Sequence, residues 1–107
     1  MTDPLILLYS PFPSIEAARE VARILLEERL VACCNLLPGM ESHYRWEGRL
    51  TSATETVLLA KTPAAVATQA AAKLGELHPY AIPAILQLPV EVNAGFAQWA
   101  ATETAAK

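Results

Sequence analysis

Two histidines and two adjacent cysteines carry the side chains of this sequence that are best suited to bind a metal ion. Imidazole nitrogen and thiolate sulfur are ligands of copper and zinc, so His78 and a cysteine are candidate ligands. A closed site takes about four ligands, and these residues share no short helical or turn spacing. The alternative for His78 is a histidine that interacts with free carbonyls at a helix C-terminus. Spacing alone therefore gives the metal hypothesis little support. His43 is interpreted as a solvated strand residue.

A pocket for a small ligand is the second possibility. Its candidate lining residues are Tyr44, Trp46, Lys61 and Tyr80, although aromatic residues at alternating strand positions more often serve packing. The sequence has no Gly-rich phosphate loop, no nucleophile elbow and no Cys-x-x-Cys motif. It also offers no carboxylate pair or Cys/His dyad on which an enzyme mechanism could be built. We therefore expect a binding protein and not an enzyme.

Cys33 and Cys34 are expected to be free thiols. Adjacent side chains of an extended segment point to opposite faces, so a disulfide between them would be strained. A reducing cytoplasm favours free thiols as well, and cysteine is among the most buried residue types. Packing is therefore the default interpretation of both side chains.

A single α+β domain over residues 1–107 is predicted to position these side chains. Its elements follow from apolar runs, from stripes at helical spacing, such as Ala18, Ala22, Leu25 and Leu26, and from alternation with period two. The predicted elements are a central strand at 5–10, an amphipathic helix over 15–30 capped by Ser14, a strand at 31–37, hairpin arms at 40–47 and 49–61, a helix from the Thr62-Pro63 cap to Leu77, a core strand at 85–88 and a short helix capped by Asn93. The tail over 103–107 is expected to fray.

This order of elements predicts a ferredoxin-like βαββαβ fold with an antiparallel four-stranded sheet, a long hairpin and an extra C-terminal helix. Both crossover helices would cover one face of the sheet. The other face would be bare, although apolar residues occur on both faces of the first two strands. The extra helix or a neighbouring subunit must cover it, and the hairpin would overhang the core. Association between chains is therefore expected.

Composition points to the same conclusion. The 107 residues are 53% hydrophobic and only 18% charged, which excludes a disordered chain. A net charge of −3 argues against nucleic-acid binding. The uncharged stretch from Leu77 to Val90 contains prolines and is shorter than the roughly 20 apolar residues of a membrane span. The N-terminus lacks the features of a signal peptide, so we expect a cytoplasmic protein without a membrane partner.

Six motifs in a fixed order resemble the signature of the CutA family, the divalent-cation tolerance proteins. The motifs are Ala32-Cys33-Cys34-Asn35-Leu36, Pro38-Gly39, Ser42-x-Tyr44-x-Trp46-x-Gly48, Glu55 through Leu58-Leu59, Lys61-Thr62 and His78-Pro79-Tyr80-x-x-Pro83. The resemblance as a whole extends from about Leu5 to Trp99. The resemblance implies a ferredoxin-like subunit in a tight homotrimer. It also implies a cytoplasmic location in bacteria, a link to copper and other divalent cations, and no established enzymatic activity.

The chain departs from this family pattern at donor positions. Ala81 and Ala84 stand where the family usually has glutamates. Tyr9 stands where some members have a cysteine, and Leu77 replaces the first histidine of a pair. His78 remains as a matching donor. Cys33 matches the family's cysteine, and Cys34 occupies a position where valine is common, which favours a packed thiol there.

The resulting hypothesis is a homotrimer with a role in copper or divalent-cation tolerance. Its inter-subunit clefts would bind a cation, copper or another divalent ion, or a small ligand. The residues assigned to the cleft are Ser42, Trp46, Lys61, His78 and Tyr80, with His78 and Cys33 as candidate metal ligands. The alternative is a PII-like regulatory module that binds a nucleotide or anion and has no metal role. The chain lacks a basic Gly-rich phosphate loop, so this alternative ranks second.

Overall fold

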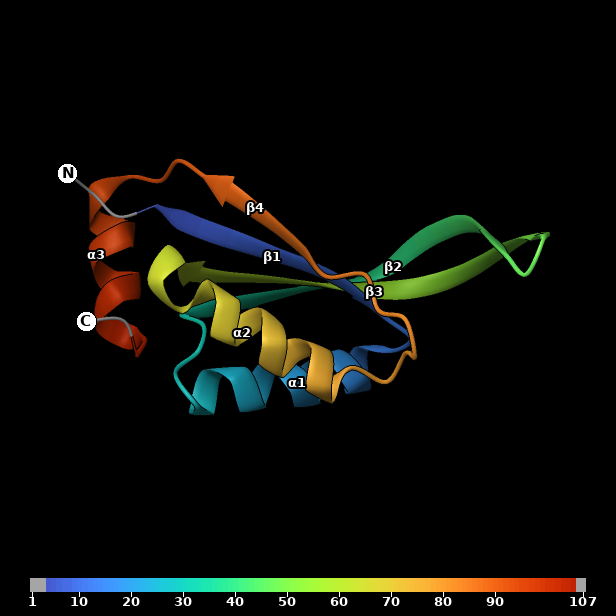
Figure 1. Cartoon of the computed structure of the whole chain (residues 1–107), viewed down its shortest axis with the longest axis horizontal. Helices are drawn as coiled ribbons and strands as arrows, with labels where there is room; N and C mark the ends of the chain where they lie inside the picture. The colour runs from blue at the N-terminus through green and yellow to red at the C-terminus, as the bar shows by residue number, and fades with distance from the viewer. Residues whose placement is uncertain (1–3, 106–107) are drawn as a thin grey trace.

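A computed structural model describes residues 4–105 as one sheet with two helices along one face and a third helix at one end (Figure 1). The elements in chain order are β1 (Leu5–Phe12), α1 (Ile15–Glu27), β2 (Cys33–Trp46), β3 (Arg49–Pro63), α2 (Ala64–Leu77), β4 (Leu86–Val90) and α3 (Ala94–Glu103). The strands are arranged in the order β2-β3-β1-β4, and each neighbouring pair is antiparallel. The predicted ferredoxin-like α+β arrangement with an extra C-terminal helix is confirmed. Within residues 4–105 we find no helix with the length and hydrophobicity needed to cross a bilayer.

Helix α1 begins as predicted but ends three residues early. The Ser14 hydroxyl accepts a hydrogen bond from the backbone N–H of Ala17 at 3.1 Å, which satisfies a free donor of the first turn. Arg29 has a φ of 58°, and its backbone N–H bonds the carbonyl of Leu26. Together with the bond from Leu30 N–H to the Leu25 carbonyl, this forms a Schellman C-cap, so the helix cannot continue to residue 30.

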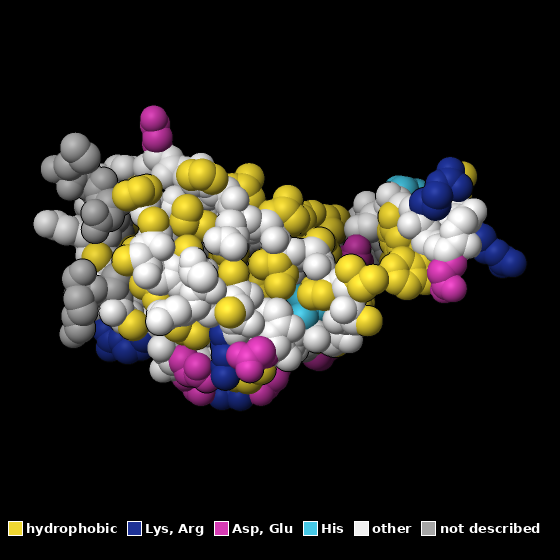
Figure 2. Space-filling model, viewed as in Figure 1, with side chains coloured by type: hydrophobic (Ala, Val, Ile, Leu, Met, Phe, Trp, Pro, Cys, Tyr) yellow, Lys and Arg dark blue, Asp and Glu magenta, His cyan; other side chains and the backbone are white. Residues whose placement is uncertain are grey.

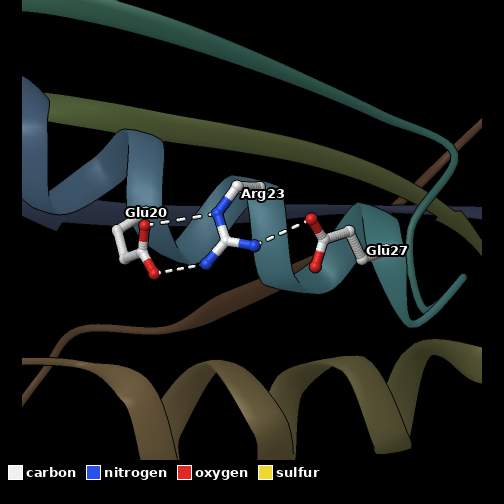
Figure 3. Close-up of polar contacts among 3 residues, drawn as sticks. All are labelled: Glu20, Arg23 and Glu27. Carbon is white, nitrogen blue, oxygen red and sulfur yellow. Dashed lines mark hydrogen bonds and ion pairs between the residues drawn. The ribbon is translucent and has the colours of Figure 1, made fainter.

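The two faces of α1 differ in polarity as the sequence indicates. Arg23 bridges Glu20 and Glu27 on the exposed face, with N···O distances of 2.5 and 2.7 Å (Figure 3). The packed face carries Ala18, Val21, Ala22 and Leu25. Leu26 was predicted to lie on the packed stripe but is 41% exposed. It borders the stripe and is not part of either hydrophobic core cluster.

The predicted cap of α2 has a different geometry. Pro63 is the N-cap itself and not the first helical residue. The Thr62 hydroxyl does not cap the helix but donates to the carbonyl of Leu30 at 2.7 Å. Thr62 is a fully buried strand residue opposite Ile6, and its side chain joins β3 to the segment after α1. Buried backbone carbonyls need a hydrogen-bond donor, and the Thr62 hydroxyl is the donor for the carbonyl of Leu30.

The long hairpin is formed by β2 and β3 and is confirmed, with one continuous strand where two pieces were predicted. Glu47 and Gly48 have φ values of 50° and 78°, which suits the tight turn predicted there. The register shifts between Leu37 and Met40, where Gly39 has a φ of 80°. The Pro38-Gly39 segment is therefore a bulge inside β2 and not a strand end. The hairpin extends beyond the helices and gives the molecule extents of 47 × 25 × 21 Å (Figure 1).

The helix-covered face of the sheet holds the main core. Leu8 and Phe12 of β1 pack with Leu25 of α1, Leu58 of β3 and Leu74 of α2, and all five are fully buried. Cys34 packs against the same cluster, as predicted for an apolar substitute. This core fixes the position of α2 relative to β1, and therefore the position of the connector that follows α2.

The opposite face of the sheet is open and apolar over most of its length. The register aligns Leu7 with Lys61 and Leu88, and Tyr9 with Leu59 and Leu86. Strand β4 was predicted to be a core strand, and this is wrong for the single chain, since all five of its residues are exposed. Its position at the sheet edge explains the difference. We call this surface the open face; it comprises Leu7, Tyr9, Cys33, Leu59, Lys61, Leu86, Leu88 and Val90.

Helix α3 covers one end of the sheet and leaves most of the open face uncovered (Figure 1). It packs through Ala97 and Ala100 against Leu5 and Ala32 in a second, smaller cluster. Asn93 is its N-cap residue, although its side chain makes no capping hydrogen bond.

Part of the tail that was predicted to fray contacts the rest of the chain. Thr104 is buried, and the backbone N–H of Ala105 bonds the carbonyl of Arg29 at 2.8 Å. The Arg29 guanidinium donates in return to the carbonyl of Thr102 at 2.8 Å. The last predicted tail residues, 106–107, lie outside the described part of the chain.

Candidate functional site

A cleft of about 490 Å³ lies where the hairpin leaves the body of the molecule. Figure 2 shows hydrophobic side chains gathered in this region. Ligand pockets commonly have volumes of about 300–1,000 Å³, so the cleft can hold a small molecule. Its wall is formed by β1, by the outer half of the hairpin and by the connector after α2: Pro11, Ser42, His43, Tyr44, Trp46, Glu55, Tyr80, Ala81, Ile82 and Ala84.

The polar centre of the cleft is the pair formed by Glu55 and Tyr80. The Tyr80 hydroxyl donates to Oε2 of Glu55 at 2.6 Å, which joins residues 25 positions apart. Burial raises the pKa of Tyr80 well above its ordinary value, and the adjacent Glu55 carboxylate raises it further. Tyr80 is therefore a neutral hydrogen-bond donor at physiological pH. Glu55 directly precedes the buried Thr56 on β3, so the core holds its backbone in place.

His78 lies behind Tyr80 and holds it in position. Its Nε2 donates to the carbonyl of Pro11 at 2.9 Å, and its Nδ1 accepts the backbone N–H of Tyr80 at 3.1 Å. The imidazole stacks on Phe12 with ring centroids 4.1 Å apart and is only 8% exposed. Burial lowers the pKa of His78 below its ordinary value, and this effect outweighs the Pro11 carbonyl and Glu55. The ring is therefore neutral, with its proton on Nε2.

The residues predicted to line one cleft divide into three groups. Ser42, Trp46 and Tyr80 line the cleft. His78 contacts the cleft through Tyr80, with ring centroids 5.0 Å apart. Lys61 is elsewhere, since its Nζ lies 5.5 Å from the ring centre of Phe96 on α3.

The position of Lys61 along the sheet explains this separation. Lys61 pairs with Leu7, four residues along β1 from the cleft residue Pro11. Four strand residues span about 13 Å. Within one chain, the structure therefore brings together three of the five predicted lining residues and keeps Lys61 apart from them.

His78 and Cys33 do not assemble a metal site in one chain. Cys33 pairs with Lys61, so it lies at the far end of the sheet from His78. Both ring nitrogens of His78 are already hydrogen bonded, and neither presents a free lone pair. Among residues 4–105 no group of three or more His, Cys, Asp or Glu side chains is arranged to hold an ion. These donors therefore do not fit a closed metal centre.

The two thiols differ in environment. Burial raises the pKa of Cys34 to about 12, with a smaller contribution from Cys33 beside it. A thiol with so high a pKa is protonated at neutral pH and is a poor nucleophile and a poor ligand. Cys33 is half-buried on the open face, and both cysteines are free thiols, as predicted.

The structure shows the surroundings of the four positions at which the chain lacks the family's donor residues. Ala81 and Ala84 line the cleft and contribute methyl groups to it. Leu77 packs against the main core, and the Tyr9 hydroxyl points to the sulfur of Met40 at 3.4 Å. None of these four positions contributes a charged oxygen, thiol or imidazole donor.

Several lining residues were not assigned to the site from the sequence. Glu55 was noted only within a motif, and Pro11, His43 and Ile82 were not assigned to the cleft at all. His43 forms an exposed contact with Glu41 at 2.6 Å, as expected for a solvated strand residue, and it also borders the cleft. A charged residue inside an otherwise Thr- and Val-rich strand was the available signal for Glu55.

Comparison with known proteins gives concordant results. A family model described as CutA1 divalent ion tolerance protein matches residues 6–103. A "Divalent-cation tolerance protein CutA" of Thermus thermophilus is 42% identical over 88 residues, which are 81% of this chain and 85% of that protein.

A crystal structure of the divalent ion tolerance protein CutA1 from Ehrlichia chaffeensis superposes with a TM-score of 0.93 at 34% identity, covering 98% of this chain and 99% of that one. The chloroplastic CutA protein of Arabidopsis thaliana is 35% identical over 83% of this chain, and the chain spans about half (49%) of that relative's length.

Proposed function

Because this chain belongs to the CutA1 divalent ion tolerance family, we propose that it acts in divalent-cation tolerance as a homotrimer that binds a cation or small ligand in the cleft at the base of its hairpin. The observation that carries this proposal is the cleft itself. A carboxylate and three aromatic side chains converge there around a space of ligand size. The ligand site is a binding site, with no catalytic step assigned to it.

The open face supports assembly. Leu86, Leu88 and Val90 are 46, 40 and 37% exposed on one strand, which a soluble monomer rarely presents next to further apolar residues. The chain exposes 6577 Å², whereas a compact monomer of 11.5 kDa is expected to expose roughly 5,800 Å². Covering the open face with copies of the same chain would bury this excess. That three copies assemble is what the family resemblance implies.

Coordination of copper by His78 remains a prediction of the family resemblance. A metal at Nδ1 would have to displace the backbone N–H of Tyr80, and Nε2 would have to lose its proton and the Pro11 carbonyl. Titration of copper chloride by calorimetry on wild type, His78→Ala and the exposed-histidine control His43→Ala measures this directly. Equal binding by all three proteins excludes His78 as a ligand. A loss confined to His78→Ala supports it.

The nucleotide-binding alternative is not favoured by the family match. None of the described residues that line the cleft is lysine or arginine, whereas phosphate groups are usually held by such side chains or by a helix N-terminus. A cytoplasmic location stays a proposal that rests on the family resemblance; one relative is named as chloroplastic, and a CutA structure from Archaeoglobus fulgidus is named as periplasmic.

Thermal-shift measurements test the cleft as the ligand site. A ligand that binds the folded state raises Tm, so the protein is screened with divalent chlorides, organic cations and nucleotides. We expect a cation to raise the Tm of wild type and of Trp99→Ala, which changes an exposed tryptophan on α3. Trp46→Ala should abolish the rise. A rise with nucleotides alone supports the alternative, and an equal rise in both variants refutes the cleft as the binding site.

A further inference from the structure

We propose that the cleft is a site for a small organic ammonium ion, with Glu55 as counter-ion and Tyr44, Trp46 and Tyr80 as aromatic walls. The inference rests on the proposed function of the cleft as a ligand site and specifies the class of ligand. Three observations support the inference: the charge of the lining residues, the kinds of metal ligand among them, and their aromatic side chains.

The charge of the cleft selects a cation. Glu55 contributes a carboxylate, and the exposed Glu41 lies just outside, in contact with His43. The described lining residues include no lysine or arginine that would neutralise Glu55. An anion would therefore be repelled by the Glu55 carboxylate, and no positively charged lining residue would offset this repulsion. A positive ligand meets an opposite charge in a partly desolvated space, where the attraction is stronger than in water.

The side-chain donors of the cleft suit a bare divalent ion poorly. Calcium and magnesium take about six or more oxygen ligands, and zinc takes about four nitrogen, sulfur or oxygen ligands. The described side chains that line the cleft offer the Glu55 carboxylate, of which one oxygen already accepts from Tyr80, the hydroxyls of Ser42, Tyr44 and Tyr80, and the His43 imidazole, whose Nε2 contacts Glu41. Among residues 4–105 no three His, Cys, Asp or Glu side chains are arranged to hold an ion. Ala81 and Ala84 add only methyl groups. A strongly hydrated ion could not replace its lost water molecules here.

An organic ammonium ion makes use of what the cleft does provide. Its alkyl groups carry little water, so burying them against Ile82 and the two alanines is favourable. Its positive charge is attracted to the faces of tryptophan and tyrosine rings, a contact on which proteins that recognise quaternary ammonium groups rely. Three aromatic residues line this cleft beside one carboxylate.

The Tyr80 wall is fixed before a ligand arrives. The Tyr80 backbone is held by Nδ1 of His78, and its hydroxyl is held by Glu55. His78 is in turn stacked on the buried Phe12 and bonded to the Pro11 carbonyl. Because this chain of contacts is anchored in the core, little side-chain freedom of Tyr80 is lost on binding, which favours affinity.

The test uses the full-length assembled protein and tetramethylammonium chloride as the probe. Trp99→Phe leaves Trp46 as the single tryptophan, so fluorescence reports on the cleft. We expect a saturable change with tetramethylammonium and none with sodium chloride at equal ionic strength or with tert-butanol, a neutral molecule of similar shape. In that background Glu55→Gln should weaken binding roughly tenfold or more, because a charged partner is lost.

Two controls keep the test decisive. Glu47→Gln removes an exposed carboxylate from the hairpin turn beside Trp46 and should leave the affinity unchanged. Glu55→Asp keeps the charge and should bind more tightly than Glu55→Gln, and sedimentation verifies that each variant retains the wild-type mass. Equal weakening by Glu47→Gln and Glu55→Gln, or no response to tetramethylammonium, overturns the inference. If another cation still raises Tm in a Trp46-dependent way, the proposed function stands; if no ligand does, the proposed function fails too.

Discussion

Protonation of His78 is expected to destabilise the protein as the pH falls below about 6.5, the ordinary pKa of an imidazole. In the folded chain Nδ1 accepts the backbone N–H of Tyr80. A proton on Nδ1 would replace this hydrogen bond by two opposed donors and place a charge on a side chain that is only 8% exposed. The native state therefore disfavours the proton, in agreement with the lowered pKa of His78.

The sign and size of the effect follow from proton linkage. Because the unfolded chain binds the proton more readily than the folded chain, stability is complete above about pH 6.5 and is lost as the pH falls toward the folded pKa. One proton taken up on unfolding gives a slope of at most about 1.4 kcal/mol per pH unit. Carboxylates titrate mainly below pH 5, so the window from pH 6.5 to 5 isolates the histidines.

Urea unfolding at fixed protein concentration, measured at several pH values between 5 and 8, tests this expectation. Wild type and His43→Gln should lose stability together as the pH falls from 6.5 to 5, because His43 is exposed. His78→Gln cannot titrate and should show a flatter profile. Equal slopes for wild type and His78→Gln would refute the assignment of a neutral, Nε2-protonated His78.

Further substitutions test the packing, the open face and the thiols. Leu74→Ala should lower the free energy of unfolding by about 2–5 kcal/mol in urea titrations, and Leu26→Ala by much less, since Leu74 is fully buried and Leu26 is 41% exposed; similar losses would contradict the assigned core. Leu88→Glu should reduce the sedimenting mass by placing a charge on the open face, whereas Gln87→Glu on the same strand should not; an unchanged mass for both would exclude the open face from the interface. In the Leu88→Glu protein, whose open face is expected to be uncovered, iodoacetamide at pH 8 followed by mass spectrometry should modify Cys34 more slowly than Cys33, because burial raises the pKa of Cys34 to about 12; equal rates would contradict the packed environment of Cys34.

Elements that depend on local signals were predicted well from the sequence. The Ser14 cap, the acidic exposed face of α1 and the Glu47-Gly48 turn each depend on residues within a few positions of one another. The end of α1 was missed because it depends on Arg29 adopting a positive φ. That conformation is accompanied by contacts with Thr102 and Ala105, far away in the sequence.

The cleft was only partly predictable because long-range pairing assembles it. Tyr80 and Trp46 stand out as aromatic residues, but the importance of Glu55 follows from a hydrogen bond across 25 positions. Lys61 was assigned to the cleft by motif, whereas its register opposite Leu7 places it at the other end of the sheet. The exposure of β4 likewise follows from strand order, which no local pattern encodes.

Assembly of three copies through the open face is tested most directly by sedimentation equilibrium of the wild-type protein at micromolar concentration. We predict a single species of about three times 11.5 kDa that persists on dilution through the micromolar range. A monomer of 11.5 kDa would contradict the role given to the open face and the trimer together.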